Sequence, residues 1–572
     1  MALQVQHPAA TLADKSWARW TALALLAFAM FCSYIFMDIL SPIKDLLQSQ
    51  KGWDSTAFGT MQSSETFLNV FIFFLIFAGI ILDKMGVRFT AVLSGVVMLV
   101  GAAINWYALT DMFAGSGLEV WFTNHLNYIP GFQELGISPF YEGMPASAKF
   151  SAVGFMIFGC GVEMAGITVS RGIVKWFKGH EMAMAMGTEM ALARLGVGTC
   201  MIFSPFFATQ VGDGISVSRP VAFAVVLLMI ALIMFIVYFF MDKKLDSQTH
   251  AAEEKDDPFR LRDLGKILSS QGFWIVALLC VLYYSAIFPF QKYAVNMLQC
   301  NLTLSPPADH SFWKSETATL IQYLIMLVVA GTAFGGNFSK DKISKYTLFS
   351  IAVVALIAYC VFGYMRQSAA AIFAVFPLLA VGITPVLGSY VDHKGKAASM
   401  LVFGSLLLIL CHLTFAFILP MCKGNAVLGV VVAYLTILVL GASFSLVPAS
   451  LWPSVPKLVD SKIIGSAYAL IFWIQNIGLW LFPLLIGKIL TATNGDITAQ
   501  VEAGKMTEEV ASVSYNYVWP LVMLAFLGVA ALVLGLYLKI LNRRDNLGLE
   551  EPNIKAESPM AEESEIESAD IV

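Results

Sequence analysis

Charge is scarce in this sequence. Asp, Glu, Lys and Arg together make up 13% of the 572 residues, about half of the share that a soluble domain carries. The eight cysteines show no metal-binding or redox spacing, and those in apolar runs are expected to act as small hydrophobic side chains. We therefore expect no metal and no cofactor, and the net charge of −4 gives no indication of nucleic-acid binding.

Long hydrophobic runs are the dominant feature of the chain. Hydrophobic residues make up 58% of it, and many runs reach the roughly 20 residues that a helix needs to cross a hydrocarbon core of about 30 Å. A β-barrel would instead require short strands of alternating hydrophobicity. The sequence thus predicts an all-α polytopic membrane protein with about 14 transmembrane helices. The expected spans are residues 20–40, 57–82, 89–109, 149–170, 181–210, 220–241, 271–298, 316–338, 346–365, 369–391, 397–420, 426–451, 461–491 and 515–541.

The positions of Lys and Arg predict the orientation in the membrane. If the N-terminus is cytoplasmic, the cytoplasmic loops and ends hold 24 of these residues and the opposite loops hold 8. Such an excess is typical of cytoplasmic loops in membrane proteins, so we expect both termini in the cytoplasm. Three basic residues are left within spans, namely Arg194, Lys292 and Lys488.

The chain divides into two halves joined by a charged connector. The expected parts are a cytoplasmic N-terminus (1–19), a six-helix bundle (20–241), a cytoplasmic connector (242–270), a second bundle (271–541) and a tail (542–572). Two additional apolar segments within about 316–365 predict a helical hairpin that packs outside the twelve core helices. The tail is rich in Glu and Ser and low in hydrophobic residues, so we expect it to be disordered.

Two similar loops follow the second span and its counterpart in the second half. The first ends in Arg88 and contains Asp83 and Gly86; the second, residues 388–396, contains Asp392. An acid at a helix end and basic residues across a glycine turn can latch two helices together, and we interpret these residues as a gating loop. The alternative is an ordinary polar loop. These loops and the arrangement in two sets of spans resemble the major facilitator superfamily, which implies two helical bundles that rock around a central site.

Longer motifs narrow the resemblance. Residues 161–164 read Gly-Val-Glu-Met, residues 176–181 read Trp-Phe-Lys-Gly-His-Glu, and residues 190–196 read Met-Ala-Leu-Ala-Arg-Leu-Gly. They are similar to the branch of the superfamily that contains the lysosomal dipeptide uniporter and its bacterial relatives, and the similarity covers most of the chain. The resemblance implies a dipeptide site that uses an acid at Glu163 and an arginine at Arg194.

Glu163 and Arg194 also suit this task chemically. An arginine near the middle of a membrane helix costs roughly 2.5–3.5 kcal/mol on insertion scales, so it needs a partner, a cavity or a substrate. A dipeptide is a zwitterion, whose amino end a carboxylate can bind and whose carboxylate a guanidinium can bind bidentately. The alternative is a salt bridge between Glu163 and Arg194 that joins their helices. Glu189 is a further acid within a span, and we take Glu163 and Glu189 as candidates for proton coupling, although helix packing explains Glu189 equally well.

Further residues are candidates for contact with the substrate. Asp38 lies at the outer end of the first span, where an acid can bind an amine or form a gate, unless it is simply a helix-end aspartate in water. Pro289 is expected to break its span, and aromatic side chains around the break would bound the side-chain pockets of the substrate. Two amides in mid-span suit a peptide group, although interhelical hydrogen bonds explain them as well. These aromatic and amide candidates are Tyr283, Tyr284, Phe288, Gln475 and Asn476.

Together these features predict a transporter of small zwitterionic solutes, with dipeptides as the expected substrate. The sequence leaves open whether it is a uniporter or a proton symporter. The alternatives are a carrier for another organic anion or amino-acid-like solute and, from a different class, a non-transporting membrane sensor. We expect no enzyme, because catalysis needs a nucleophile–base set or metal ligands at depth and His412 is the only histidine within a span.

Location and assembly are predicted only in outline. No acidic dileucine sorting signal stands before the first span, which favours a bacterial inner membrane or plasma membrane over the lysosome. We expect a monomer in the lipid bilayer, and the sequence identifies no accessory subunit.

Overall fold

The described part of the chain folds into helices. The computed structural model describes residues 11–177, 180–249, 265, 267–459 and 464–552, and this part contains no β-strand. The helices of the first half are α1 (Ser16–Asp38), α3 (Ser55–Phe71), α4 (Phe74–Leu109), α6 (Ala146–Phe177), α7 (Met182–Thr209) and α8 (Ser218–Thr249). The second half contains α10 (Gln271–Asn301), α11 (Glu316–Phe338), α12 (Lys342–Met365), α13 (Ala369–Phe373), α14 (Val375–Lys394), α15 (Ala397–Leu413), α16 (Leu419–Met421), α17 (Ala426–Leu451), α18 (Ile464–Thr493) and α21 (Val518–Asp545).

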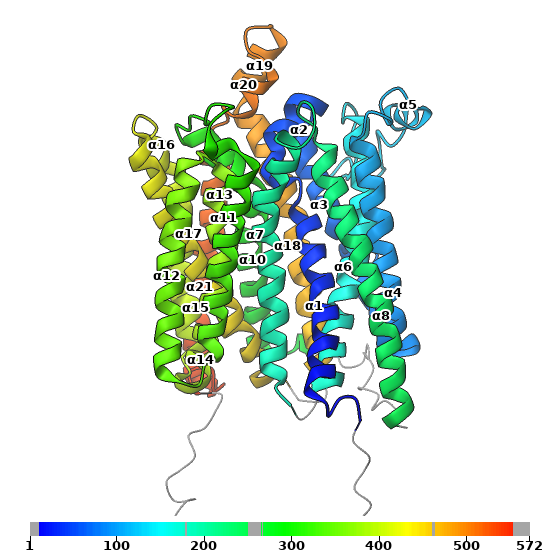
Figure 1. Cartoon of the computed structure of the whole chain (residues 1–572), viewed down its shortest axis with the longest axis vertical. Coiled ribbons are helices and arrows are strands. Elements are labelled where there is room, and N and C mark those ends of the chain that lie inside the picture. The colour runs from blue at the N-terminus through cyan, green and yellow to red at the C-terminus, as the bar shows by residue number, and fades with distance from the viewer. Residues whose placement is uncertain (1–10, 178–179, 250–264, 266, 460–463, 553–572) are drawn as a thin grey trace, which may run out of the picture.

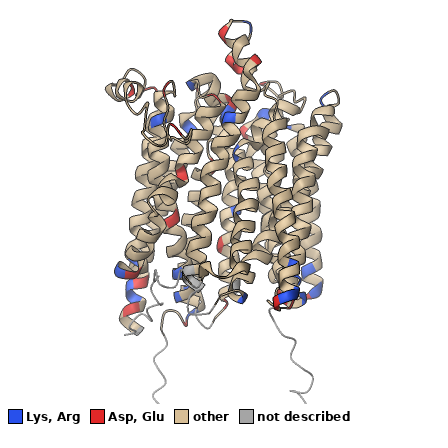
Figure 2. Cartoon of the chain, turned by 180° about the vertical axis from the view of Figure 1, so that it is seen from behind, with Lys and Arg blue, Asp and Glu red and all other residues tan. Residues whose placement is uncertain are grey.

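The two ends of the bundle differ in what they carry (Figure 1). α1 begins and α21 ends at one end, which we name the terminal end. The opposite end, which we name the loop end, carries the short helices α2 (Lys44–Lys51), α5 (Gly117–Asn124), α19 (Gly495–Glu502) and α20 (Glu508–Ser512). Figure 2 shows Lys and Arg gathered at the terminal end of both halves, where the sequence analysis expects the basic loops.

The number of spans agrees with the sequence prediction. Thirteen of the described helices are long and apolar enough to cross a membrane, and α3, with 17 residues, is too short for that count. α4 contains the end of the second span and the whole of the third, because Gly86 with φ 78° and ψ 167° turns the chain between them. α3 and the first part of α4 together form the second span, so the all-α architecture of about 14 transmembrane helices is confirmed.

The second span is broken near its middle, which the sequence did not predict. Phe73 has φ 55° and ψ 39°, a left-handed conformation that residues other than glycine rarely adopt. The break frees the carbonyl of Val70, which accepts a hydrogen bond of 3.1 Å from the indole N–H of Trp473 in α18. The rings of Phe73 and Trp473 stack at 5.3 Å. α18 therefore satisfies the backbone that the break exposes, as a membrane interior requires.

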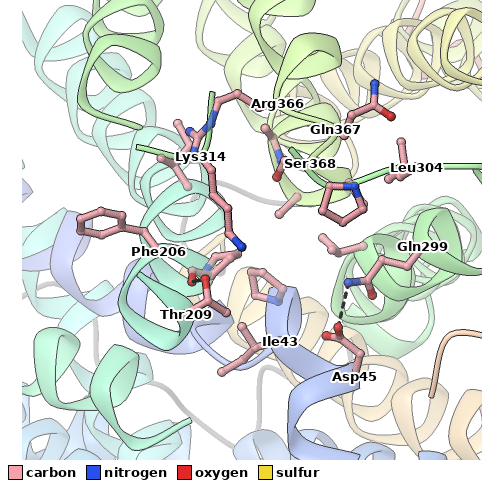
Figure 3. A pocket seen from close by; sticks show the side chains of 18 of the residues that line it. Ile43, Asp45, Phe206, Thr209, Gln299, Leu304, Lys314, Arg366, Gln367 and Ser368 are labelled. Carbon is pink, nitrogen blue, oxygen red and sulfur yellow. Dashed lines mark hydrogen bonds between the residues drawn. The ribbon is translucent and has the colours of Figure 1, made fainter. Parts of the chain in front are cut away.

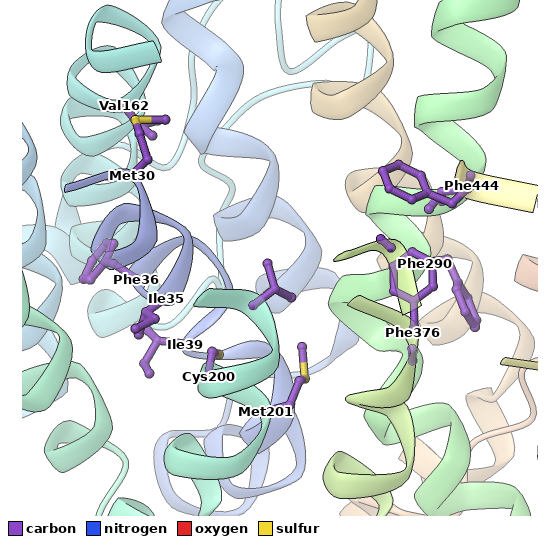
Figure 4. Packing of buried hydrophobic residues seen from close by; sticks show 14 of the residues in the cluster. Met30, Ile35, Phe36, Ile39, Val162, Cys200, Met201, Phe290, Phe376 and Phe444 are labelled. Carbon is purple, nitrogen blue, oxygen red and sulfur yellow. The ribbon is translucent and has the colours of Figure 1, made fainter. Parts of the chain in front are cut away.

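Each half packs around buried apolar side chains of its own (Figure 4). In the first half, Phe36 of α1 lies 4.4 Å from the ring of Phe158 in α6. In the second half, Phe376 of α14 meets Phe444 of α17 at 5.7 Å. α4 and α6 approach so closely that a Cβ atom on Gly101 would collide with the backbone of α6. Small residues are the usual means of bringing membrane helices into such contact.

The inserted hairpin consists of α11 and α12 and lies after the first helix of the second half. α12 packs mainly on α11 and leaves most of its surface outside the bundle, as expected for an addition to the twelve core helices. α11 reaches further, because Tyr323 contacts the ring of Phe203 in α7 at 4.8 Å and the hydroxyl of Thr199 at 3.3 Å. The hairpin therefore touches both halves.

The segment between α4 and α6 forms an ordered cap at the loop end. The buried ammonium of Lys149 in α6 donates hydrogen bonds to the carbonyls of Phe122 at 3.1 Å and His125 at 3.3 Å. It also contacts the side chain of Asn127. These bonds fix α5 and the turn after it to the end of the bundle.

The chain after α21 packs against the terminal end. The backbone N–H groups of Lys396 and Ala397 donate to the carbonyls of Glu550 and Leu549 at 3.1 and 3.0 Å. The hydroxyl of Ser399 donates to the Glu550 carboxylate at 3.0 Å. The disorder expected from residue 542 is therefore wrong up to residue 552, because these backbone groups pair with the turn after α14. Most of the expected connector (250–264 and 266) and the rest of the tail (553–572) lie outside the described residues.

Gly86 offers a test of the turn that separates the second and third spans. Its conformation is accessible almost only to glycine and costs about 1–3 kcal/mol for another residue. We expect Gly86→Ala to lower the midpoint of thermal unfolding of the detergent-purified protein. Gly79→Ala in the same helix is the matched control, because open space surrounds that position and alanine favours a helix. Equal midpoints for the two variants would contradict this account of the turn.

Candidate functional site

Arg194 of α7 is an intramembrane cation without an acidic partner among the described residues. Its guanidinium lies over three rings, at 4.8 Å from Phe444, 5.0 Å from Phe288 and 5.7 Å from Tyr34. These rings belong to α17, α10 and α1, so both halves surround the charge. Cation–π contacts contribute about 0.5–2 kcal/mol each, but they leave the N–H donors free. Because the side chain is only half-buried, a ligand carboxylate can reach it.

Glu163 of α6 faces the second half. Its Oε1 accepts a hydrogen bond of 3.2 Å from the amide of Asn476 in α18, so two of the predicted site residues meet here. Between these described residues, no salt bridge joins Glu163 to Arg194. The salt bridge between Glu163 and Arg194, which the sequence left open as an alternative, is therefore absent from this conformation. The carboxylate is half-buried and keeps acceptor capacity for a ligand.

Glu189 lies on α7, five residues before Arg194. It makes no hydrogen bond or ion pair with any described residue. Tyr34 of α1 lies beside Arg194, because the guanidinium is 5.7 Å from the centroid of its ring. Among the described residues, no hydrogen bond or ion pair joins Arg194, Glu163 and Glu189 to one another.

Tyr284 and Phe288 of α10 form an aromatic wall beside Arg194. Their ring centroids lie 5.3 Å apart, and the indole N–H of Trp452 donates to the Tyr284 hydroxyl at 3.2 Å. All three side chains are half-buried. The wall can bound an apolar part of a ligand and offers the Tyr284 hydroxyl as a polar contact.

The structure gives different outcomes for three other predicted residues in this region, Tyr283, Gln475 and Pro289. Tyr283 is buried and its hydroxyl lies 2.7 Å from that of Ser405 in α15, so this structure directs it away from Arg194. Gln475 is half-buried and accepts a weak hydrogen bond of 3.4 Å from the thiol of Cys280. The expected break at Pro289 is wrong, because α10 runs as one helix from Gln271 to Asn301. Neighbouring helices allow a membrane span to tolerate a proline.

Asp38 of α1 belongs to a buried ion network. Its carboxylate lies 3.0 Å from the ammonium of Lys292 in α10 and accepts a hydrogen bond of 2.6 Å from Gln291. Lys292 also lies 3.6 Å from Glu65 of α3 and donates to the carbonyl of Met37 at 2.7 Å. Asp38 is 1% exposed, so the alternative of a helix-end aspartate in water is wrong. The network joins the two halves.

Further contacts between the halves lie at the loop end. The ammonium of Lys44 donates to Asn296 at 3.2 Å, and the amide of Gln299 donates to Asp45 at 3.0 Å. Further hydrogen bonds cross the halves at the loop end, from Gln48 to Glu508 and between Thr56 and Thr491, and at middle depth, between Thr199 and Tyr323 and from Trp473 to Val70. The structure is therefore closed at the loop end.

The predicted gating loop pairs within the first half. Asp83 forms an ion pair with Arg171 at the end of α6, and Arg88 forms one of 2.7 Å with Asp246 of α8. The turn between them is the one that Gly86 makes. In the second half, Asp392 occupies the corresponding place at the end of α14. The first of these loops ties neighbouring spans of the first half together at the terminal end.

Sequence reasoning missed four residues in this region. Glu65 is an acid inside a predicted span, so its position alone could have identified it. Tyr34, Phe444 and Trp452 carry no such signal, because aromatic residues are common in membrane spans and only the fold brings these three together.

The sequence matches a family model and several curated relatives. The model described as Major Facilitator Superfamily matches residues 26–366, more than half of the chain. The relative named lysosomal dipeptide transporter MFSD1 from Danio rerio is 23% identical over 482 residues, which cover 82% of this chain and 80% of the relative. The protein of that name from Homo sapiens is 21% identical over 480 residues, with coverage of 82% and 80%.

Solved structures share the fold. A bacterial homologue of the human lysosomal transporter Spinster, inward-facing and unoccupied, has a TM-score of 0.56 and 10% identity, with 92% of this chain and 98% of that chain covered. The xylose transporter XylE from E. coli, in a partially occluded inward-open conformation, has a TM-score of 0.53 and 10% identity, with coverage of 90% and 98%. A point mutant of the nucleoside transporter NupG has a TM-score of 0.52 and 13% identity, with coverage of 89% and 98%.

Lys292 provides a test of the ion network. Lys292→Met leaves the buried carboxylates of Asp38 and Glu65 without their cation, and breaking a buried pair in this way costs about 3–5 kcal/mol. We expect a marked fall in the midpoint of thermal unfolding in detergent. The double variant Lys292→Met/Asp38→Asn should recover part of the loss, since it removes one of the uncompensated charges.

Lys488→Met is the control for this test, because Lys488 contacts the carbonyl of Gly136 and no carboxylate among the described residues. A fall no larger for Lys292→Met than for Lys488→Met would show that the network does not hold the structure together.

Proposed function

The chain belongs to the Major Facilitator Superfamily, and we propose that it carries small zwitterionic solutes, specifically dipeptides, across the membrane by alternating access. As a member of that family it is a multi-pass integral membrane transporter with a small-molecule substrate. The curated relatives named dipeptide transporters support the substrate class, at 21–23% identity over about four fifths of the chain.

One observation carries the proposal, namely the separate and accessible charges of Arg194 and Glu163. Arg194 has aromatic neighbours but no acid, and Glu163 has one neutral hydrogen-bond partner. A zwitterion would give both groups a partner of opposite charge, because its carboxylate would bind Arg194 and its ammonium would bind Glu163. The aromatic wall of Tyr284 and Phe288 would contact a side chain of the dipeptide, and the amide of Asn476 would bind its peptide group.

The ion network of Asp38, Lys292 and Glu65 would act as the gate at the loop end. It joins α1 and α3 of the first half to α10 of the second. Opening the loop end requires these charges to separate and meet water. While the halves rock, the gating loops that contain Asp83 and Asp392 would keep each half rigid.

The proposed orientation puts the terminal end in the cytoplasm. Support comes from the excess of Lys and Arg in the loops on that side, 24 against 8, which is typical of cytoplasmic loops. The predicted location in a bacterial inner membrane or plasma membrane contrasts with the lysosomal location in the names of the curated relatives. The proposed transport chemistry is the same in either membrane.

A carrier for another organic anion is the second candidate. A site in which only Arg194 binds the ligand would favour this candidate, because an organic anion binds the guanidinium but has no ammonium for Glu163. A non-transporting sensor would bind the same ligands without moving them.

Uptake into proteoliposomes tests the proposal. We expect saturable uptake of labelled alanyl-alanine by the wild type and a loss of about tenfold to a hundredfold in kcat/KM for Arg194→Gln and for Glu163→Gln. The reason is that each variant removes a charged hydrogen bond, worth about 1.5–3 kcal/mol. Lys505→Gln, which removes an exposed charge at the loop end, is the control and should transport normally.

Blocked substrates separate the candidates. N-acetyl-alanyl-alanine lacks the ammonium, so we expect it to be a poor substrate whose transport is insensitive to Glu163→Gln. If the N-acetylated compound is transported as well as the free dipeptide, the carrier is one for organic anions. Binding without flux would identify a sensor.

The same vesicles distinguish a uniporter from a proton symporter. A symporter concentrates the dipeptide when an inward proton gradient is imposed, whereas a uniporter only equilibrates it. Glu189 has no partner among the described residues and lies near Arg194, so in a symporter we expect Glu189→Gln to abolish the response to the gradient while dipeptide exchange continues. Accumulation that persists in Glu189→Gln would exclude this residue from coupling.

A further inference from the structure

A cavity lies at the loop end, apart from the region around Arg194. Its volume is about 450 Å³, within the range of small-molecule sites. The first half contributes the turn after α1 and the end of α7, and the second half contributes the end of α10 and the start of α13. The inserted hairpin contributes its two loop-end termini. Figure 3 shows Arg366 and Lys314 on one side of this cavity and Asp45 with Gln299 on the opposite side.

The cationic side is built around Arg366. Its guanidinium donates to the side chains of Gln322 at 2.7 Å and Thr319 at 2.6 Å and to the carbonyl of Trp313 at 3.1 Å. No carboxylate pairs with it among the described residues. A guanidinium has five N–H donors, so these three bonds position the group and leave two donors for a ligand.

Gln322 adds a donor that has no partner. Its side chain is fully buried, its oxygen accepts from Arg366, and its amide nitrogen has no hydrogen-bond partner. A buried amide donor left unsatisfied costs about 1–3 kcal/mol. Gln322 also lines the cavity. A ligand carboxylate that accepts from Arg366 and from this amide would remove the deficit.

Asp45 of α2 supplies the opposite charge. It is half-buried, lines the cavity and accepts one hydrogen bond from Gln299. No ion pair holds it among the described residues, and a carboxylate with one bond keeps further acceptor sites. Lys314 pairs with Asp309 in the loop before α11, so its charge is already balanced.

We propose that this cavity is a second binding site for a small zwitterionic solute of amino-acid to dipeptide size. Its carboxylate binds Arg366 and Gln322, and its ammonium binds Asp45. Phe206 and the apolar residues around it cover the rest of the ligand. Asp45 belongs to the first half and Arg366 to the second, so a bound zwitterion joins the halves while the loop end is closed. Solute on the loop side therefore stabilises the closed state.

Protection of an introduced cysteine tests the site. Thr209 lines the cavity at the exposed end of α7, and Thr209→Cys can be labelled with a membrane-impermeant maleimide in the full-length purified protein. We expect alanyl-alanine to slow the labelling, whereas N-acetyl-alanyl-alanine and alanyl-alanine amide should protect at least about tenfold less well, because each lacks one of the two charges. The parent protein without Thr209→Cys gives the background from the native cysteines.

Three further variants, each combined with Thr209→Cys, separate this site from the central one. Protection should persist with Arg194→Gln, whatever that variant does to transport, and should weaken about tenfold or more with Asp45→Asn or Arg366→Gln. If Arg366→Gln does not fold, the Asp45→Asn variant alone still tests the proposed site. The inference is overturned if the dipeptide gives no protection, if Arg194→Gln alone abolishes it, or if it is unchanged in Asp45→Asn.

Discussion

The pairing of buried charge is the constraint on which the arrangement of this bundle depends. Lys292 lies between Asp38 and Glu65, and none of the three could remain in a dry interior alone, since an isolated buried ion costs several kcal/mol. The three residues come from α10, α1 and α3, so satisfying one ammonium brings two halves of the protein together. Together with the hydrogen bonds from Lys44 to Asn296 and from Gln299 to Asp45, that contact closes the loop end.

Intramembrane charges in this protein fall into two kinds. Those of the ion network have partners, whereas Arg194 lies among rings and Glu163 accepts from one neutral amide. A carrier needs both kinds, because a binding site must leave its charges available while a gate must hold its charges together. The network also suits a moving gate. An ion pair that is stable when dry loses its advantage when water enters, so closed and open states can have similar free energies.

The inserted hairpin does more than cover the bundle. α11 reaches α7 of the first half through Tyr323, and the ends of the hairpin supply Arg366 and Gln322 to the loop-end cavity. An insertion outside the twelve core helices can thus add chemistry where the two halves meet. The broken second span shows the same dependence on neighbours, since Trp473 of α18 satisfies the carbonyl that the break frees.

The sequence by itself determined the helical class, the number of spans, the two-half organisation and the unusual charges Glu163 and Arg194. These are local properties: hydropathy over about 20 residues decides whether a segment enters a membrane, and a charge in such a segment stands out. Only the tertiary structure decided which charges meet. Asp38 and Lys292 are far apart in sequence, and no local pattern marks them as partners. Phe73 breaks a span without glycine or proline, whereas α10 continues through Pro289, because contacts with neighbouring helices outweigh local preference.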